Sequence, residues 1–236
     1  YCFLQGMYRS ANYVVFINYE DFFAQIKALA DTSDTRHYFF SGYDADSLAY
    51  EPVTGFVAEC LPFFATLPQA TLELRTKSAN VRALLRHKPI DNCVVAFSMT
   101  PDEIARSCEH KTPAMSKRIA ALHQLAQVGW QVGVRLDPLI YTQDYATVYP
   151  QLIEAIFSQL PADSLHSVSV GPLRFPAKMH RAIQKLYPQE KLLSAGLVKQ
   201  GKIVSYAKEN QAELAQCVRQ SLAQYVDQSR IFTCHS

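Results

Sequence analysis

The residues best suited to chemistry in this chain follow short apolar runs that predict β-strands. Polar side chains come directly after several of these runs. In sheets of parallel strands, ligands bind at the carboxyl ends of the strands, so we expect these side chains to share one site. Their carboxylate, ammonium, hydroxyl and guanidinium groups suit acid/base chemistry or the binding of a charged small molecule. The set is Tyr43, Asp44, Asp46, Lys77, Ser78, Ser98, Asp137, Gly171 and Arg174.

The cysteines are a second group with chemical potential. They are widely spaced, which favours a reduced, cytoplasmic protein over a disulfide scaffold. His110 lies near Cys108, and His235 follows Cys234, but both pairs are too isolated to indicate zinc. The six are Cys2, Cys60, Cys93, Cys108, Cys217 and Cys234.

The elements that would position these residues alternate along the chain. Strands are predicted at residues 14–17, 38–40, 72–76, 93–97, 132–136 and 168–170, the last being the final clear strand. Helices are predicted at residues 20–30, 48–65, 81–85, 115–126, 145–160, 177–186 and 209–225. This alternation predicts an α/β fold with a parallel sheet, either open and doubly wound or curled into a full or partial barrel.

The bulk composition limits the function classes. The chain has 236 residues, of which 49% are hydrophobic and 19% charged, so it can form one globular domain. Its net charge of +2 neither requires nor excludes nucleic acid. No run of 18 apolar residues occurs, so we expect no membrane span. The motifs GxxxxGK[ST], GxGxxG, HExxH and GxSxG are all absent, which gives no support to the site types that they mark.

Several short segments fit one family pattern by their order and spacing. They are Tyr1-Cys2-Phe3-Leu4-Gln5-Gly6, Val15-Phe16-Ile17-Asn18-Tyr19-Glu20-Asp21-Phe22, Asp46-Ser47-Leu48-Ala49, Leu74-Arg75-Thr76-Lys77-Ser78, Ala96-Phe97-Ser98-Met99, Thr112-Pro113, Arg118-Ile119-Ala120-Ala121, Asp137-Pro138-Leu139-Ile140 and Tyr187-Pro188. Together they resemble the spore photoproduct lyase family of radical S-adenosylmethionine (SAM) enzymes.

The resemblance implies a fold and a domain organisation. We expect a partial parallel (β/α)6-type barrel of the radical SAM kind over residues 1–190, without its N-terminal strand and two cluster cysteines. Residues 191–236 would be an irregular, α-rich segment that covers the same domain.

The resemblance also implies a chemistry. A [4Fe-4S] cluster would be held by three thiolates of a CxxxCxxC loop, with Cys2 as the third ligand and two further cysteines upstream. The reduced cluster would cleave SAM to a 5′-deoxyadenosyl radical that abstracts hydrogen from a substrate, and a flavodoxin or ferredoxin would supply the electron. A DNA pyrimidine lesion is one substrate that the resemblance suggests.

Individual residues carry this implied chemistry. Lys77 and Ser98 match residues that hold the methionyl end of SAM, and Asp137 matches a strand end near the adenosine. Phe3 lies where backbone groups approach the adenine. Asp46 belongs to the same cofactor-binding set through its matching segment.

The chain departs from the family pattern at the hydrogen-donating positions. Tyr43 occupies the place of the donor cysteine, and Ala45 that of a serine two residues later. Phe3 replaces a relay tyrosine, whereas Tyr1 is kept. We therefore group Tyr43 and Tyr1 as candidate catalytic residues of a lyase-like enzyme and leave its substrate open.

Two alternative functions and one question about nucleic acid remain open at this stage. The chain could be a non-catalytic radical-SAM-like binding or scaffold domain. It could also be a barrel enzyme with ordinary acid/base chemistry using Asp44, Asp46 and Asp137, since a fold does not fix a function. Finally, a basic stripe on the predicted helix 177–186 could contact DNA phosphates or be a solvated helix face; its members are Lys178, Arg181 and Lys185, with Arg174 just ahead.

Overall fold

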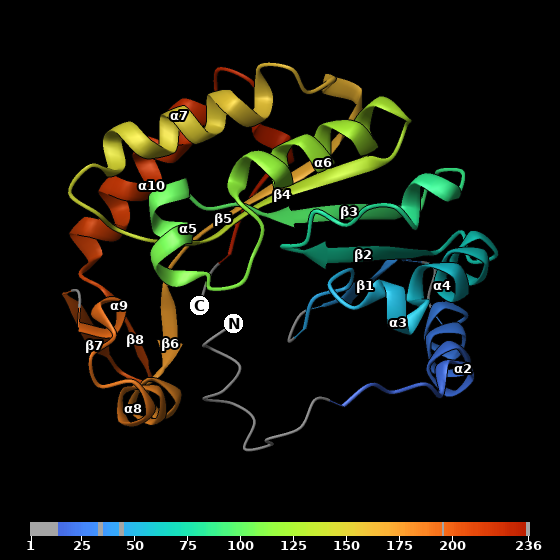
Figure 1. The fold of residues 1–236 in the computed structure, drawn as a ribbon, viewed down its shortest axis with the longest axis horizontal. Coiled ribbons are helices and arrows are strands. Elements are labelled where there is room, and N and C mark those ends of the chain that lie inside the picture. Colours follow the sequence, from blue (N-terminus) through green and yellow to red (C-terminus); the bar gives the residue numbers. More distant parts are fainter. Residues whose placement is uncertain (1–13, 33–34, 43–44, 195, 235–236) are drawn as a thin grey trace.

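A curled sheet of six parallel strands forms the centre of the molecule (Figure 1). The computed structural model describes residues 14–32, 35–42, 45–194 and 196–234. The strand order is β1-β2-β3-β4-β5-β9, and every neighbouring pair is parallel. The strands are β1 (His37–Ser41), β2 (Ala70–Thr76), β3 (Cys93–Ser98), β4 (Gln131–Leu139), β5 (Leu165–Pro172) and β9 (Ile231–Thr233).

Helices connect the strands, and most of them pack on the outer, convex face of the sheet (Figure 1). The helices are α2 (Tyr19–Ala30), α3 (Glu51–Thr54), α4 (Phe56–Ala65), α5 (Asp102–Cys108), α6 (Met115–Gln127), α7 (Tyr145–Phe157), α8 (Ala177–Leu186), α9 (Lys191–Ser194) and α10 (Lys208–Leu222). Of these, α8 and α9 lie away from that face (Figure 1). Short 3-10 turns lie at Leu84–Arg86, Ala162–Ser164 and Gln228–Arg230. The result is a half-barrel of βα units, which confirms the fold class that the sequence predicted.

Alternation along each strand separates the two faces of this sheet. Leu72 and Leu74 of β2 belong to the hydrophobic core beneath the helices, as do Val95 and Phe97 of β3. The residues between them, such as Glu73, point to the opposite, concave face. Helix burial on one side therefore leaves a second side free to carry polar groups.

A small antiparallel sheet follows the half-barrel. Its order is β6-β8-β7, formed by β6 (Arg174–Pro176), β7 (Leu197–Gln200) and β8 (Ile203–Tyr206). In Figure 1 it lies with α8 and α9 beyond the carboxyl ends of β2 and β3. The chain then returns through α10 to add β9 to the main sheet, so the C-terminal segment contributes a strand as well as cover.

Two strand predictions are wrong. Residues 14–17 form no strand, and their side chains are 48–81% exposed, because no neighbouring strand pairs with them within the described ranges. The run 168–170 is not the final strand, since four more follow it. The helix predicted at 48–65 is divided into α3 and α4 by Gly55, whose φ of 59° ends the first helix in a left-handed conformation.

No helix among the described residues combines the length and apolar character needed to cross a bilayer.

Candidate functional site

The concave face of the half-barrel gathers the polar side chains of the central strands. The strand register places four residues side by side on β2 to β5: Arg75, Ala96, Gly133 and Ser167. Residues two positions before or after them on the same strand also face the concave side. Polar groups in the interior of a curled parallel sheet are unusual for a packed core and are typical of a ligand site.

Deep on this face, a charged pair joins two strands that are not neighbours. Arg135 of β4 donates from Nη2 to Oε2 of Glu73 at 2.6 Å and from Nε to Oε1 at 3.1 Å, across β3. Both side chains are 5% exposed. Arg75 adds two hydrogen bonds to Glu73, at 2.8 and 3.0 Å. We call Glu73 and Arg135 the floor pair.

The environment of the floor pair is closed. Arg135 also donates from Nη1 to the Ser167 carbonyl oxygen at 3.2 Å, so its guanidinium bridges β2 to β5. A Cβ on Gly133 would lie 2.8 Å from Arg135 Nη2, so only glycine leaves room for this arrangement. Burial opposes ionisation of Glu73, but the neighbouring Arg135 and Arg75 charges outweigh it and lower its pKa. The floor pair therefore stays charged and fixed.

At the carboxyl end of β2, Lys77 forms a second ion pair with a partner outside the sheet. Its Nζ lies 2.6 Å from Oε1 of Glu109, just after α5. The other carboxylate oxygen accepts a hydrogen bond from Nη2 of the fully buried Arg118, also at 2.6 Å. Arg118 Nη1 then donates to the backbone carbonyl oxygen of Ser98 at 3.1 Å.

The structure places Lys77 and Ser98 at neighbouring strand ends. The last residue pair between their strands is Thr76 with Phe97, so Lys77 and Ser98 follow at adjacent strand ends. Ser98 lies on the concave face with Ala96, two residues earlier. These are the two residues that the sequence assigned to one end of a ligand.

Asp46 has a different setting. Its Oδ1 accepts hydrogen bonds from Thr76 Oγ1 at 2.6 Å and from the Leu48 and Ala49 backbone amides at 3.0 and 2.9 Å. Its Oδ2 accepts one from the Lys77 backbone amide at 2.7 Å. The carboxylate thus ties the loop after β1 to the end of β2, directly beside the Lys77 side chain.

Asp137, at the carboxyl end of β4, forms a third ion pair. Its carboxylate receives two hydrogen bonds from the Arg174 guanidinium, at 3.1 and 3.3 Å, and these side chains are 19% and 27% exposed. Gly171 lies beneath, where a Cβ would meet Arg174, Cys234 and Asp137 at 2.9 to 3.1 Å. We call Lys77–Glu109 and Asp137–Arg174 the mouth pairs.

Cys234 brings a thiol to the same place. Its backbone amide donates to the Val170 carbonyl oxygen at 3.0 Å, which holds the residue beside β5 just after β9. Burial raises the pKa of this thiol, and the hydrogen bond and negative charge of Asp137 raise it further. The thiol is therefore protonated at neutral pH.

Five predicted site residues, Tyr1, Cys2, Phe3, Tyr43 and Asp44, lie outside the described residues. Sequence reasoning missed Glu109, Arg118, Cys234 and the floor pair. Glu109 follows a helix, so it lies at no strand end, and Cys234 follows β9, a three-residue strand that the sequence analysis did not predict. The alternation of Leu72-Glu73-Leu74-Arg75 could have revealed Glu73 as an inward-pointing residue.

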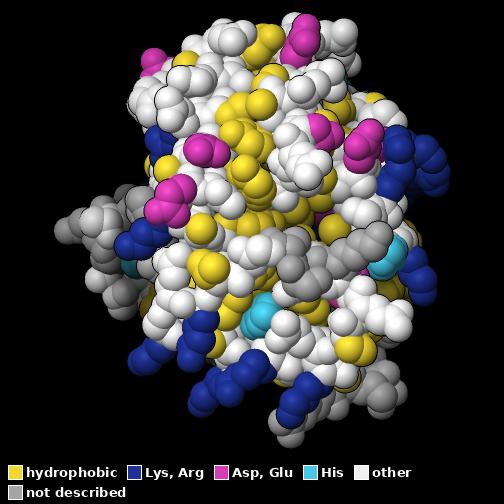
Figure 2. Space-filling view, turned by 90° about the vertical axis from the view of Figure 1, so that its left-hand side faces the viewer, with side chains coloured by type: hydrophobic (Ala, Val, Ile, Leu, Met, Phe, Trp, Pro, Cys, Tyr) yellow, Lys and Arg dark blue, Asp and Glu magenta, His cyan; other side chains and the backbone are white. Residues whose placement is uncertain are grey.

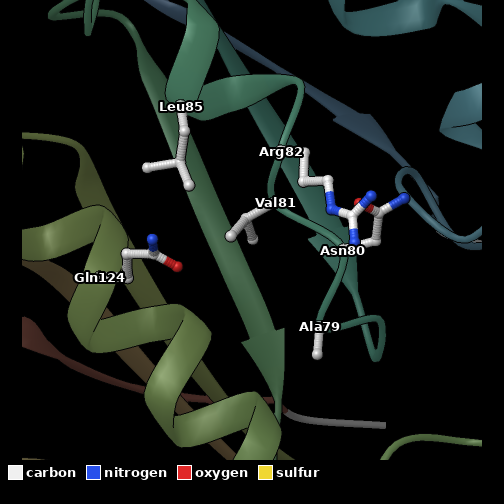
Figure 3. Close-up of a pocket in the computed structure, with 6 residues that line it drawn as sticks. All are labelled: Ala79, Asn80, Val81, Arg82, Leu85 and Gln124. Atoms are coloured by element: carbon white, nitrogen blue, oxygen red, sulfur yellow. The ribbon is translucent and has the colours of Figure 1, made fainter.

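A separate pocket lies on the helix-covered side of the sheet (Figure 3). It has a volume of about 540 Å³ and lies between the segment after β2 and helix α6. Figure 3 shows Val81 and Leu85 directed toward Gln124, with Asn80 and Arg82 on the other side; Ala79 completes the lining. It shares no lining residue with the concave-face site. Within the described ranges, no group of three His, Cys, Asp or Glu residues is arranged for a metal ion.

A half-barrel of parallel strands with charged groups at its carboxyl end defines the class to which this chain belongs, the partial barrels of the radical SAM kind. Comparison with known proteins narrows this class. The spore photoproduct lyase family model matches residues 1–233. The chain is a member of the spore photoproduct lyase family.

Known relatives and structures agree with this assignment. The spore photoproduct lyase of Bacillus subtilis (strain 168) is 26% identical over 196 residues, which is 81% of this chain and 57% of that protein. That of Geobacillus sp. (strain Y412MC61) is 25% identical over 198 residues, 81% of this chain and 58% of that protein. The chain thus spans less than two thirds of these relatives.

Solved structures show the same fold. A spore photoproduct lyase variant with bound AdoMet and dinucleoside spore photoproduct superposes with a TM-score of 0.82 at 21% identity, covering 99% of this chain and 71% of the other. A second variant gives a TM-score of 0.82 at 23% identity with the same coverage.

Proposed function

We propose that this chain is the SAM-binding half-barrel of a radical SAM enzyme similar to spore photoproduct lyase. The observation that carries the proposal is the position of Lys77 and Ser98 at adjacent strand ends above a polar concave face, with Asp137 at a third strand end. The family match and the AdoMet bound in a similar structure support it.

The residues at the mouth fit the chemical groups of SAM. The Lys77 ammonium has three N–H donors, so it can hold Glu109 and the methionyl carboxylate together. The Ser98 hydroxyl can donate to the same carboxylate or accept from the amino group. Asp137 presents oxygens that can accept from ribose hydroxyls, and Arg174 fixes their direction.

We also propose that Cys2 is a ligand of a [4Fe-4S] cluster, because a thiolate is the ligand type that iron–sulfur clusters use. Bound together and supplied with an electron by a flavodoxin or ferredoxin, the cluster and SAM provide radical chemistry that removes a hydrogen atom from carbon. The half-barrel's part is to orient the ligand and to keep water away from it. Tyr1 and Tyr43 are the proposed hydrogen-relay residues.

For the substrate we propose a pyrimidine lesion of DNA, as in the relatives that bind dinucleoside spore photoproduct. Charge at the surface supports this choice. Figure 2 shows Lys and Arg side chains gathered on the lower part of one face and Asp and Glu on the upper part. Helix α8 lies at the lower end of the molecule, and its Lys178, Arg181 and Lys185 are exposed. Such a row can contact DNA phosphates.

The test measures 5′-deoxyadenosine formed after anaerobic reconstitution of the full-length protein with iron and sulfide. Lys77→Met removes the ammonium, and we expect it to raise the SAM concentration for half-maximal rate about tenfold or more, as the loss of a charge-assisted hydrogen bond requires. Lys117→Met, at an exposed position of α6, is the matched control and should leave the rate unchanged.

The outcome separates the alternatives. No 5′-deoxyadenosine from the reconstituted parent protein would favour a scaffold domain. Formation of 5′-deoxyadenosine without consumption of added dinucleoside spore photoproduct would keep the radical chemistry but reject this substrate. Equal behaviour of the Lys77 and Lys117 variants would remove Lys77 from the SAM site.

A further inference from the structure

Glu109 occupies a central position that no strand-end rule anticipates. One of its oxygens lies 2.6 Å from Lys77 Nζ, and the other accepts from Arg118 Nη2 at 2.6 Å. Thr100 Oγ1 lies at 3.4 Å from the first oxygen. A single carboxylate therefore holds two cations from different elements, β2 and α6, at once.

Arg118 extends this connection to the next strand. Besides its bond to Glu109, it donates to the Ser98 carbonyl oxygen at 3.1 Å, to Thr112 Oγ1 at 2.6 Å and to the Pro113 carbonyl oxygen at 3.2 Å. Its side chain has no exposed surface. A guanidinium with this many fixed acceptors cannot change its orientation without breaking several hydrogen bonds.

We propose that Glu109 is a positioning residue for SAM, acting as a strut that fixes the Lys77 ammonium relative to Ser98. The path runs from Lys77 through Glu109 and Arg118 to the backbone of Ser98. This inference rests on the proposed function, because it assigns the methionyl end of SAM to the two residues that the path connects.

The physical reason for such a strut is the mobility of lysine. Its four-carbon side chain loses conformational entropy when it is fixed, which costs free energy. An ion pair formed before ligand binding bears that cost in advance, so the ligand meets an ammonium already in place. Among the described residues, two further charged groups lie nearby: Asp46 accepts from the Lys77 backbone amide, and Arg118 donates to the other oxygen of Glu109.

The first experiment compares the affinities of two ligands by calorimetry. SAM carries the methionyl end, whereas 5′-methylthioadenosine keeps the adenosine and sulfur without it. Glu109→Gln keeps the shape but removes the charge, and we expect it to weaken SAM binding about tenfold while leaving 5′-methylthioadenosine unchanged. Glu103→Gln, an exposed position on α5, makes the same charge change and should alter neither.

Two results would overturn the inference while leaving the proposed function intact. In one, Glu109→Gln binds SAM as the parent does. In the other, it loses both ligands equally, which would show a general structural defect. A parent that binds neither ligand would count against the proposed function itself.

A second measurement does not depend on SAM. The rate at which acetic anhydride modifies Lys77, followed by peptide mass spectrometry, reports how firmly the ammonium is held. Glu109→Gln should raise that rate several-fold, because a neutral amide holds the Lys77 side chain less firmly than the carboxylate does and leaves its amino group more accessible to the reagent. The rates at Lys117 and in Glu103→Gln should stay constant. An unchanged rate at Lys77 would reject the strut whatever the protein binds.

Discussion

The floor pair and the mouth pairs use the same two strands in opposite ways. Strand β2 carries Glu73 and is followed by Lys77, and β4 carries Arg135 and then Asp137. Glu73 and Arg135 pair with each other, strand to strand, with 5% exposure each. Lys77 and Asp137 instead find their partners outside the six-stranded sheet, in Glu109 after α5 and Arg174 in β6.

This difference shows how one face of the sheet can combine a rigid part with a part that moves when a ligand binds. A pair between strands of one sheet cannot separate unless the sheet deforms, so the floor pair sets the spacing of β2 and β4. The Asp137–Arg174 pair can adjust when a ligand arrives, because only the short strand that carries Arg174 has to move. At the other mouth pair, Glu109 and the buried Arg118 hold the Lys77 ammonium in place. We therefore expect the floor pair to maintain the sheet, and the mouth is the end of the face at which we propose that the ligand binds.

The largest expected effect is the loss of stability on breaking the floor pair, compared with the loss on breaking a mouth pair. Glu73→Gln leaves the buried Arg135 guanidinium without its anion and should lower the free energy of unfolding by about 3 kcal/mol. Asp137→Asn at the partly exposed mouth should lower it by less than about 1 kcal/mol. Urea denaturation of the two variants and the parent measures both values.

A double variant sharpens this result. Glu73→Leu combined with Arg135→Met removes both charges and should recover much of the stability that Glu73→Gln loses, because the cost lies in the uncompensated charge. Equal losses in Glu73→Gln and Asp137→Asn would contradict the division between floor and mouth.

The half-barrel could be predicted from sequence because its strands are short, β-branched and bounded by helices. The prediction failed where the formation of a strand depends on a neighbouring strand to pair with and not on the composition of the segment itself. Residues 14–17 have strand composition but no partner in the described sheet, whereas β9 has a partner and only three residues. The hairpin of β7 and β8 had a usable signal in Gly201, whose φ is 62°, between two apolar runs.

The site residues likewise divide into those that could be predicted from the sequence and those that could not. Lys77, Ser98 and Asp137 could be found because strand ends in parallel sheets converge by geometry. Arg174 belonged to the same predicted set, but its pairing with Asp137, 37 residues away, could not be predicted, and Glu109, 32 residues from Lys77, was missed. Which cation meets which carboxylate depends on how helices and the small sheet pack, and no local pattern contains that information.

Two glycines offer a smaller test of the same comparison. Gly133→Ala places a methyl group 2.8 Å from Arg135 Nη2, in a guanidinium held by four hydrogen bonds, and should cost about 1–2 kcal/mol of unfolding free energy. Gly171→Ala meets Arg174 Nη1 at 2.9 Å, but Arg174 is more exposed and can turn away, so its cost should be about half as large. Thermal unfolding of both variants gives the comparison.

The reverse order would show that the mouth is the more rigid region. Gly171 also faces Cys234 Cβ at 3.0 Å, and a thiol fixed there would resist the added methyl group. The two variants together thus report how freely Arg174 and Cys234 can move, which Glu73→Gln and Asp137→Asn do not measure.

The smallest expected effect concerns the reactivity of Cys234. Alkylation requires the thiolate, and burial together with Asp137 raises the pKa of this thiol above its usual value near 9. Its rate with iodoacetamide should therefore still be rising with pH at pH 9. Asp137→Asn removes the negative charge that raises the pKa, so the pKa should fall and the rate at pH 8 should rise roughly threefold.

Peptide mass spectrometry resolves Cys234 from the other cysteines in this experiment. Asp144→Asn, which neutralises an exposed carboxylate in the loop after β4, is the control and should leave the profile in place. A faster reaction at all pH values, without a shift of the profile, would mean that Asp137 only shields the thiol sterically. A shift of the profile to lower pH instead shows that Asp137 of the mouth pair acts on Cys234 through its charge. The floor pair has no such effect on Cys234, so this result would distinguish the two regions.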